Sequence, residues 1–259
     1  MESTKKFEEL KKLETKNNEI SPEEDKKIDL MRSSLTVLQE QEDNNISVKE
    51  VGDDLMLRRF LRARDGDVEK ATSMFVKYLS WRKSFVPNGS ISASEVAKDL
   101  NQNKMFMQGF DKQGRPITVG LAGRHFHLKG GIEDYKRYVV YFLDKVISRM
   151  PSGQEKFVFI GDLDGWGYAN IDIRACLGAL TVLQDFYPER LGKLFIVNAP
   201  YIFMMVWKMI TPFIDNNTKK KIIFVEKKDI KATLLEDIEE NQLPDVYGGK
   251  LSLVSIQDA

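Results

Sequence analysis

Short runs of β-branched and aromatic residues alternate with segments of helix length after about residue 100. Each run is typical of a strand, and the segments between the runs are long enough for crossover helices. This order predicts an α/β fold with a mostly parallel sheet. The predicted strands cover residues 116–121, 156–161, 193–197 and 221–225, and the predicted helices cover residues 132–150, 171–186 and 201–214.

The first hundred residues follow a helical pattern instead. Apolar residues recur at helical spacing inside a strongly charged leader, at Ile28, Met31, Leu35 and Leu38. Two more helix patterns follow, with Asp53 and Asp67 placed to cap them and Gly66 between them as a turn. The turn-rich residues 86–90 indicate a boundary between modules. We expect a charged helical leader, a helical module and an α/β domain, at residues 1–50, 51–95 and 96–259.

The charge balance and the cysteine content bound the class of protein. Lys+Arg and Asp+Glu both count 39, so no net charge draws the whole chain to nucleic acid or to an anionic membrane. A single cysteine, Cys176, excludes an internal disulfide and favours a reducing compartment. The start lacks a signal-peptide pattern, and the most apolar stretch, residues 200–214, is shorter than the roughly 20 residues that cross a bilayer. We expect a cytoplasmic protein that is peripheral at membranes.

Two carboxylates, Asp162 and Asp164, follow an apolar strand and form the most enzyme-like feature of the chain. Such pairs at strand ends hold Mg²⁺ against a phosphate in phosphoryl- and glycosyl-transferring enzymes. A phosphatase of that kind also needs a downstream lysine and a second acidic cluster after a later strand. Of the two later strand ends, residues 198–200 have no acidic residue and only residues 226–229 do. The favoured interpretation is a pair that caps a loop. The Mg²⁺-dependent enzyme is kept as the alternative.

The histidines give no stronger indication of catalysis. His125 and His127 alternate on an extended segment, where both side chains can point the same way, but no cysteine or nearby carboxylate completes a metal site. No phosphate-binding loop and no nucleophile paired with a base stand out. We therefore expect no catalytic residue, no metal and no cofactor.

Two further features each allow two interpretations. The segment 201–214 is apolar around nearly its whole helical circumference, which suits either a buried core helix or a lid over a lipid cavity. If the last two strands are parallel neighbours, Glu189 and Lys221 start at the same sheet edge and can meet. That pair, with Thr218, suits either a surface salt bridge or the recognition of a sugar-alcohol headgroup.

Five motifs, in order and at characteristic spacing, resemble the CRAL-TRIO family, and within it the fungal and plant phosphatidylinositol transfer proteins of the secretory pathway. The resemblance covers about residues 54–251 and implies an N-terminal helical module followed by an α/β domain that encloses a lipid cavity behind a helical gate. The motifs are residues 57–64 (LRRFLRAR), 78–82 (YLSWR), 187–193 (YPERLGK), 198–200 (NAP) and 243–249 (LPDVYGG).

The resemblance also implies roles for individual residues. Glu189, Thr218 and Lys221 fall on the phosphoinositol site, and Arg62 and Arg64 match the basic helix of the N-terminal module. The gate falls on residues 201–214, with Tyr201, Phe203, Met204, Trp207, Ile210 and Phe213.

One departure from the family affects the expected ligand. Relatives that bind phosphatidylcholine carry paired hydroxyl residues where this chain has Phe157 and Phe159, which would line the cavity without offering hydrogen bonds. We predict one bound phospholipid, with phosphatidylinositol favoured and phosphatidylcholine weakened or replaced by another hydrophobic lipid. The expected partners are this lipid, a transient membrane surface and a lipid kinase or trafficking protein, but not nucleic acid, and the expected state is a monomer. A lipid-sensing scaffold that presents its ligand remains a further alternative.

Overall fold

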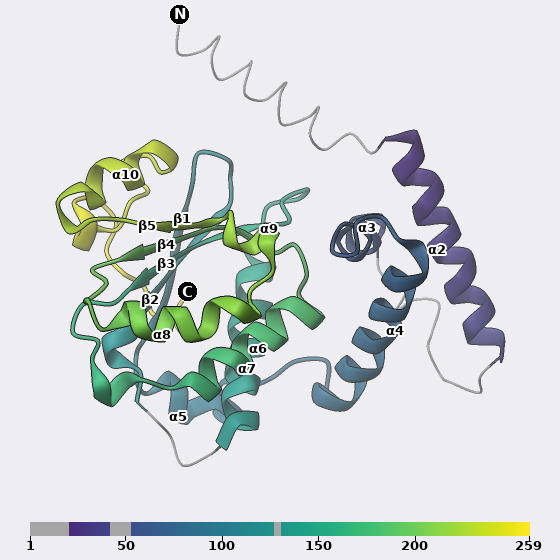
Figure 1. Cartoon of the computed structure of the whole chain (residues 1–259), viewed down its shortest axis with the longest axis horizontal. Coiled ribbons are helices and arrows are strands. Elements are labelled where there is room, and N and C mark those ends of the chain that lie inside the picture. The colour runs from purple at the N-terminus through teal and green to yellow at the C-terminus, as the bar shows by residue number, and fades with distance from the viewer. Residues whose placement is uncertain (1–20, 42–52, 127–130) are drawn as a thin grey trace, which may run out of the picture. The chain divides into compact units, whose positions relative to one another are not determined.

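The computed structural model describes residues 21–41, 53–126 and 131–259, which Figure 1 colours along the chain. Two compact units make up the chain, Met1–Ser80 and Trp81–Ala259. Helix α4, Val68–Phe85, begins in the first unit and ends in the second. The expected three-part division stays a prediction, and most of its leader, residues 1–20 and 42–50, lies outside the described residues.

The first unit contains α2 (Pro22–Gln41), α3 (Asp54–Arg62) and the larger part of α4. Their apolar faces form one core, made of Ile28, Met31 and Leu35 from α2, Leu57, Phe60 and Leu61 from α3, and Ala71, Met74 and Phe75 from α4. Leu38 was expected to continue the buried stripe but is 39% exposed, because the core contacts of α2 end one turn earlier.

The predicted helix starts of the first unit are confirmed. The side chain of Asp53 accepts a hydrogen bond from the backbone N–H of Met56 (2.8 Å), and Asp67 accepts one from Lys70 (3.0 Å). Gly66 has φ of +75°, which is the left-handed conformation that a glycine adopts at low cost between two helices.

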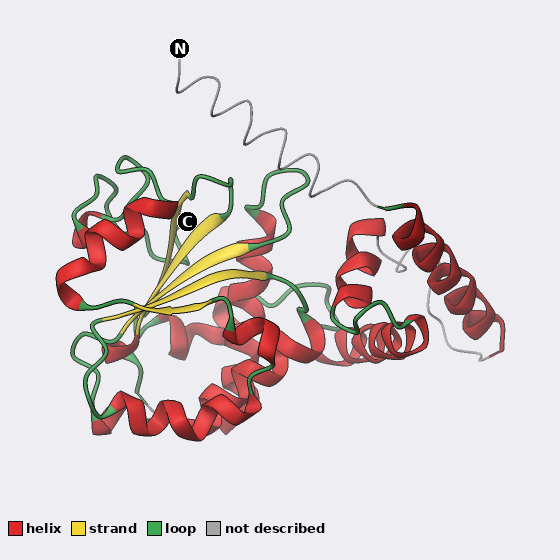
Figure 2. Cartoon of the chain, turned by 45° about the horizontal axis from the view of Figure 1, so that its top comes forward, coloured by secondary structure: helices red, strands yellow, loops and turns green. Residues whose placement is uncertain are grey.

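The second unit is built on a five-stranded sheet in the order β1-β2-β3-β4-β5 (Figure 2). The strands β2 to β5 are parallel, as predicted, and β1 pairs with β2 in the antiparallel sense. The sequence did not predict β1, because Gln108 and Gly109 interrupt its alternation at an irregularity in the pairing. The strands are Met105–Phe110, Pro116–Leu121, Phe157–Asp162, Leu191–Val197 and Ile222–Phe224.

The helices of this unit form layers on both faces of the sheet. Figures 1 and 2 show α6, α7 and α8 on one face and α10 on the other. Two separate apolar clusters match these layers, one that joins α6 to Phe157 of β3 and one that joins α10 to Val158 and Ile160. The helices are α5 (Ala97–Leu100), α6 (Gly131–Ser148), α7 (Ile173–Phe186), α8 (Phe203–Ile210), α9 (Asn216–Lys219) and α10 (Ile230–Asp237).

Short 3-10 turns complete the connections of the second unit. They are η2 (Ala93–Val96), η3 (Ala122–Arg124), η4 (Tyr168–Asn170), η5 (Thr211–Phe213), η6 (Lys227–Asp229) and η7 (Asp245–Tyr247). The turn η5 directly follows α8, so the predicted helix at residues 201–214 is a two-turn α-helix with a 3-10 end.

Candidate lipid-binding site

Glu189 and Lys221 lie together at the amino edge of the parallel strands. Glu189 precedes β4, Lys221 precedes β5, and these strands are neighbours in the sheet. The Lys221 Nζ and Glu189 Oε2 atoms are 3.2 Å apart, and the two side chains are 19% and 21% exposed. The predicted contact is therefore present, in a partly buried place where its charges are less screened than on an open surface.

The backbone holds Glu189 in an unusual conformation. Its φ of +57° lies in the left-handed region, which is uncommon for a residue with a side chain. Such a conformation costs on the order of 1–3 kcal/mol and persists only where the surrounding contacts impose it. The contacts around Glu189 therefore hold its backbone in this strained conformation.

Thr218 reaches the same edge on the short helix α9. Asp215 caps this helix by accepting a hydrogen bond from the Thr218 N–H (2.8 Å), and the Thr218 carbonyl accepts one from the Lys221 N–H (3.0 Å). Burial acts to raise the pKa of Asp215, but the hydrogen bonds from Thr218 outweigh it and hold this pKa below its ordinary value. Asp215 is therefore an anionic cap that fixes the turn between Thr218 and Lys221.

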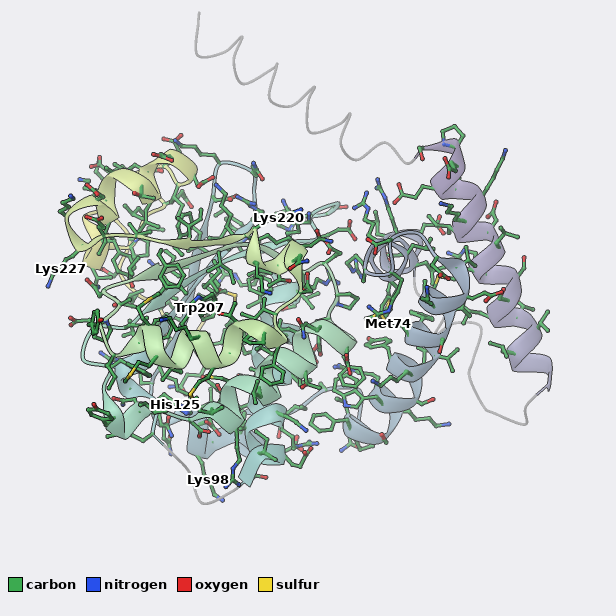
Figure 3. All side chains as sticks on the ribbon, in the orientation of Figure 1. Met74, Lys98, His125, Trp207, Lys220 and Lys227 are labelled. Carbon is green, nitrogen blue, oxygen red and sulfur yellow. The ribbon has the colours of Figure 1, made fainter. Side chains whose placement is uncertain are left out.

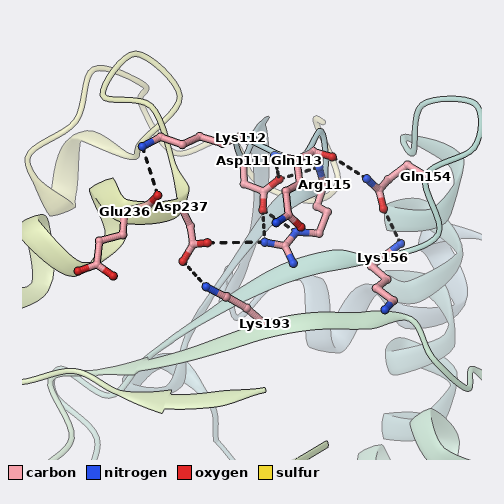
Figure 4. Close-up of polar contacts among 9 residues, drawn as sticks. All are labelled: Asp111, Lys112, Gln113, Arg115, Gln154, Lys156, Lys193, Glu236 and Asp237. Carbon is pink, nitrogen blue, oxygen red and sulfur yellow. Dashed lines mark hydrogen bonds and ion pairs between the residues drawn. The ribbon is translucent and has the colours of Figure 1, made fainter. Parts of the chain in front are cut away.

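A second group of charged residues lies at the amino ends of the strands and is internally paired (Figure 4). Arg115 Nη2 lies 2.5 Å from Asp111 Oδ2, and Lys193 Nζ lies 2.6 Å from Asp237 Oδ2. The Arg115 guanidinium passes so close to Gly192 that a Cβ there would lie 2.9 Å from its Nη1. Arg115 Nη2 also lies 3.9 Å from Asp237 Oδ1, so the group joins the β1–β2 turn to α10 and β4 and has a structural role.

The two faces of the sheet differ in how tightly they are packed. On the α10 face, Val158, Ile160 and Phe195 have no accessible surface. On the opposite face, three residues paired in register across β3, β4 and β5 keep partial exposure, namely Phe159, Leu194 and Ile222. A central strand is normally sealed by the helices that cover it. Accessible apolar surface therefore lies on the face covered by α6, α7 and α8.

Phe157 and Phe159 lie on this same face, as the strand period predicts. Their ring centroids lie 6.4 and 6.1 Å from that of Phe142 on α6. Phe157 is 2% exposed and belongs to the core, whereas Phe159 extends over Gly120, where a Cβ would lie 2.7 Å from its Cζ. Their assignment as cavity-lining residues stays a prediction.

The predicted gate segment has one inward and one outward face. Val206, Ile210 and Ile214 are buried against a cluster that includes Trp166 and Ile222. The outer face of α8 carries Met204, Met205, Lys208 and Met209, of which the methionines are 40%, 56% and 54% exposed. Tyr201 before the helix is 93% exposed and Phe213 after it is 58% exposed.

Aromatic side chains hold the inward face of α8. The Trp207 ring, labelled in Figure 3, lies 5.1 Å from that of Phe224 on β5, and the Phe203 ring lies 5.5 Å from that of Trp166. The buried Val206, Ile210 and Ile214 continue this inward face to the end of the segment. The assignment of the segment as a gate stays a prediction.

Arg62 and Arg64 lie in the first unit, and one of them is ion-paired within it. Arg62 Nε lies 3.1 Å from Glu24 Oε1 of α2, and this atom also binds Arg58 at 2.9 Å. Arg64 donates a hydrogen bond to the Ala63 carbonyl (2.9 Å). The sequence did not single out Glu24 as the partner of Arg58 and Arg62. A role for Arg62 and Arg64 at a lipid headgroup stays a prediction.

The carboxylate of Asp162 caps a loop, as the favoured interpretation expected, whereas the role of the Asp164 carboxylate stays a prediction. It accepts hydrogen bonds from the Asp164 N–H, the Asn198 amide and the Tyr247 hydroxyl, each 2.9 Å long. The pKa of Tyr247 is raised by burial and by the negative charge of Asp162, so this tyrosine stays a neutral donor. Asp162 therefore fixes the ends of β3 and β4 to the C-terminal segment.

His125 belongs to a polar cluster at the other edge of the sheet. Its Nδ1 lies 3.1 Å from Lys104 Nζ and its Nε2 lies 3.5 Å from Asp172 Oδ2, while His127 lies outside the described residues. Among residues 21–41, 53–126 and 131–259, no group of three or more His, Cys, Asp or Glu side chains is placed to hold a metal ion. Over the same ranges, no helix is long and apolar enough to span a bilayer.

Comparison with known proteins decides the family. The family model described as the CRAL/TRIO domain matches residues 100–249, and that described as the CRAL/TRIO N-terminal domain matches residues 6–77. The chain belongs to the CRAL/TRIO family. Its fold is similar to that of Sfh5, whose crystal structure aligns with a TM-score of 0.64 at 18% identity over 88% of this chain and 95% of that one.

Curated relatives of this CRAL/TRIO chain include lipid transfer proteins. A phosphatidylinositol transfer protein of Eremothecium gossypii is 31% identical over 76% of this chain and 47% of its own length. A CRAL-TRIO domain-containing protein of Saccharomyces cerevisiae is 30% identical over 78% of this chain and 72% of its own length. The chain spans only 60% of Patellin-6 of Arabidopsis thaliana, at 26% identity. Several relatives are therefore longer than this chain.

Proposed function

We propose that this chain binds one phospholipid, with phosphatidylinositol favoured, and transfers it between membranes or presents it at a membrane surface. The observation that carries the proposal is the partly buried Glu189–Lys221 pair, 3.2 Å apart at one edge of the sheet. The same sheet keeps accessible apolar surface at Phe159, Leu194 and Ile222. A polar pair beside an apolar space suits an amphiphile with a headgroup and acyl chains.

The headgroup chemistry follows from the donors and acceptors that the edge offers. A carboxylate at Glu189 accepts hydrogen bonds from inositol hydroxyls, and the ammonium of Lys221 and the hydroxyl of Thr218 donate to oxygen atoms. The acyl chains supply most of the affinity, at about 0.8 kcal/mol for each buried methylene. The polar groups then supply selectivity, because a headgroup that leaves Glu189 and Lys221 unmatched loses their hydrogen bonds.

The gate segment provides the route to the membrane. The outer face of α8 presents flexible methionine side chains, which adapt to an acyl-chain surface, and Lys208 beside them suits phosphate groups. Movement of α8 away from the sheet opens the face that carries Phe159 and Ile222. Presentation of the bound lipid to a kinase or trafficking partner stays a prediction.

The same proposal disfavours phosphatidylcholine. Phe157 and Phe159 have no hydrogen-bonding group, and Phe159 occupies the space over Gly120. A choline phosphate placed there would lose its water without gaining a donor. Phosphatidylcholine, or another apolar lipid, would then be held by its chains alone.

Transfer of labelled phosphatidylinositol between vesicles tests the proposal. Glu189→Gln and Lys221→Ala are each expected to lower the affinity for phosphatidylinositol about ten- to hundredfold, since a hydrogen bond to a charged group contributes about 1.5–3 kcal/mol. Lys220→Ala is the matched control, because this neighbouring lysine is exposed and is expected to leave transfer unchanged. Equal transfer by all three variants and the unmodified chain would refute the headgroup assignment.

A further inference from the structure

Glu189 lies in a turn between Tyr187 and Arg190, which are both held by hydrogen bonds, and follows Pro188 directly. On the downstream side, Arg190 Nη1 donates to the Glu155 carbonyl (3.0 Å), and the Arg190 carbonyl accepts from the Phe157 N–H (2.9 Å). These contacts join the end of the turn to the start of β3. The left-handed backbone of Glu189 thus lies between two fixed points.

The upstream point is a closed triad around the Tyr187 hydroxyl. This hydroxyl donates to Asp144 Oδ1 (2.7 Å) and accepts from Arg82 Nη1 (2.9 Å). Arg82 Nη2 completes the triad by donating to Asp144 Oδ2 (2.7 Å). Tyr187 is 7% exposed, so its hydroxyl is held away from bulk water by an ion pair that satisfies it as both donor and acceptor.

Ring packing fixes the elements that carry the triad. The Trp81 ring stacks on Phe186 at 3.9 Å with an interplanar angle of 4°, and it meets the Tyr187 ring edge-on at 6.3 Å. The last turn of α4 is thereby attached to the end of α7, next to the turn that contains Glu189. Arg82 cannot change its place without disturbing this contact.

We infer that the triad of Arg82, Asp144 and Tyr187 positions the Glu189 carboxylate for the headgroup. The three are positioning residues, and the inference rests on the headgroup role that we propose for Glu189. A residue in the left-handed region relaxes to a less strained backbone conformation when its neighbours are free to move. The hydrogen bonds at Tyr187 and Arg190 prevent this relaxation at Glu189.

The charges of the triad separate a positioning effect from an electrostatic one. The Arg82 guanidinium and the Asp144 carboxylate are paired 2.7 Å apart, and the hydroxyl between them is neutral. Tyr187→Phe removes the hydroxyl and keeps both charges and the ring. A change in headgroup binding in this variant therefore comes from the geometry of the turn and not from an altered field.

The test is a double-mutant cycle between Tyr187→Phe and Glu189→Gln. The probe is labelled phosphatidylinositol in phosphatidylethanolamine vesicles, and diacylglycerol in the same vesicles reports binding of the chains alone. Tyr187→Phe is expected to weaken phosphatidylinositol binding about three- to tenfold and to leave diacylglycerol binding unchanged. It is expected to have no further effect when Glu189 is already Gln, because the triad acts through that carboxylate. Tyr141→Phe, on the same helix as Asp144, is the control and is expected to behave as the unmodified chain.

Four results would overturn the inference. Additive effects of the two substitutions, or equal losses for both lipids, would assign the triad a general structural role. Unchanged phosphatidylinositol binding in Tyr187→Phe, with a loss in Glu189→Gln, would refute the triad and keep the headgroup site. Unchanged binding in Glu189→Gln would refute the headgroup site and the inference together. Should Tyr187→Phe fail to fold, Arg82→Lys replaces it in the same cycle, because it keeps the positive charge and removes the guanidinium N–H that donates to the Tyr187 hydroxyl.

Discussion

His125 is held between charges of opposite sign at the edge of the sheet away from Glu189. Lys104 Nζ lies 3.1 Å from its Nδ1, Asp172 Oδ2 lies 3.5 Å from its Nε2, and the Tyr135 ring packs against it at 5.5 Å. Burial and the Lys104 charge lower the pKa of His125 below its ordinary 6.5, although Asp172 and Asp99 act in the opposite direction. The neutral imidazole is therefore the form that the fold favours.

This arrangement predicts a pH dependence of stability. The unfolded chain binds a proton at His125 near pH 6.5 and the folded chain binds it only at lower pH, so the free energy of unfolding falls as the pH drops below 6.5. The contribution is complete above that pH and is lost as the pH falls through the lower pKa of the folded state. We expect His125→Gln to flatten this part of the profile in urea unfolding between about pH 7 and pH 5. Parallel profiles for the variant and the unmodified chain would contradict it.

The helix α8 has one apolar face that is buried against the protein and another that is exposed. Val206 and Ile210 are 6% and 7% exposed, whereas Met205 and Met209 are more than half exposed. The sequence predicted an apolar gate segment but not this division, because its residues are apolar at nearly every helical position. The packing of α8 against the sheet and α7 decides which of its faces is buried, and the sequence pattern alone does not contain this information.

The outer face of α8 is expected to contact the bilayer. Met209→Asp should weaken binding to vesicles about tenfold, since removing one apolar side chain from the interface costs roughly 1.5 kcal/mol. Co-sedimentation with vesicles measures the effect. Val246→Asp is the matched control, because Val246 is 59% exposed on η7, next to Tyr247, which packs in the apolar cluster of α10. Equal losses in both variants would show that α8 has no special part in docking.

The whole molecule shows which parts of a fold a sequence reveals. The strands β2 to β5 were predicted because each contains a short apolar run. The contact of Glu189 with Lys221 was expected only if the last two strands were parallel neighbours, which β4 and β5 are. The edge strand β1 was missed because polar Gln108 and the positive φ of Gly109 break its pattern. The position of a strand is thus predictable where burial demands a regular pattern, whereas the order of the strands in the sheet was not predicted.

Contacts between distant residues were beyond the sequence for a different reason. Arg82 reaches Asp144 and Tyr187 across separations of 62 and 105 residues, and nothing in the spacing of a single chain selects these partners. The leader is a second example. Its helix α2 supplies Met31 to the core of the first unit, with no accessible surface, whereas the sequence predicted the apolar stripe of this helix but not the residues against which it packs.

The central claim is that Glu189 and Lys221 select the lipid that occupies the second unit. Mass spectrometry of lipids extracted from the purified chain and from its Glu189→Gln variant tests it most directly. The account predicts about one phosphatidylinositol per unmodified chain and a marked depletion of this lipid in the variant, with other apolar lipids in its place. Phosphatidylinositol absent from the unmodified chain, or equally abundant in both proteins, would contradict the account.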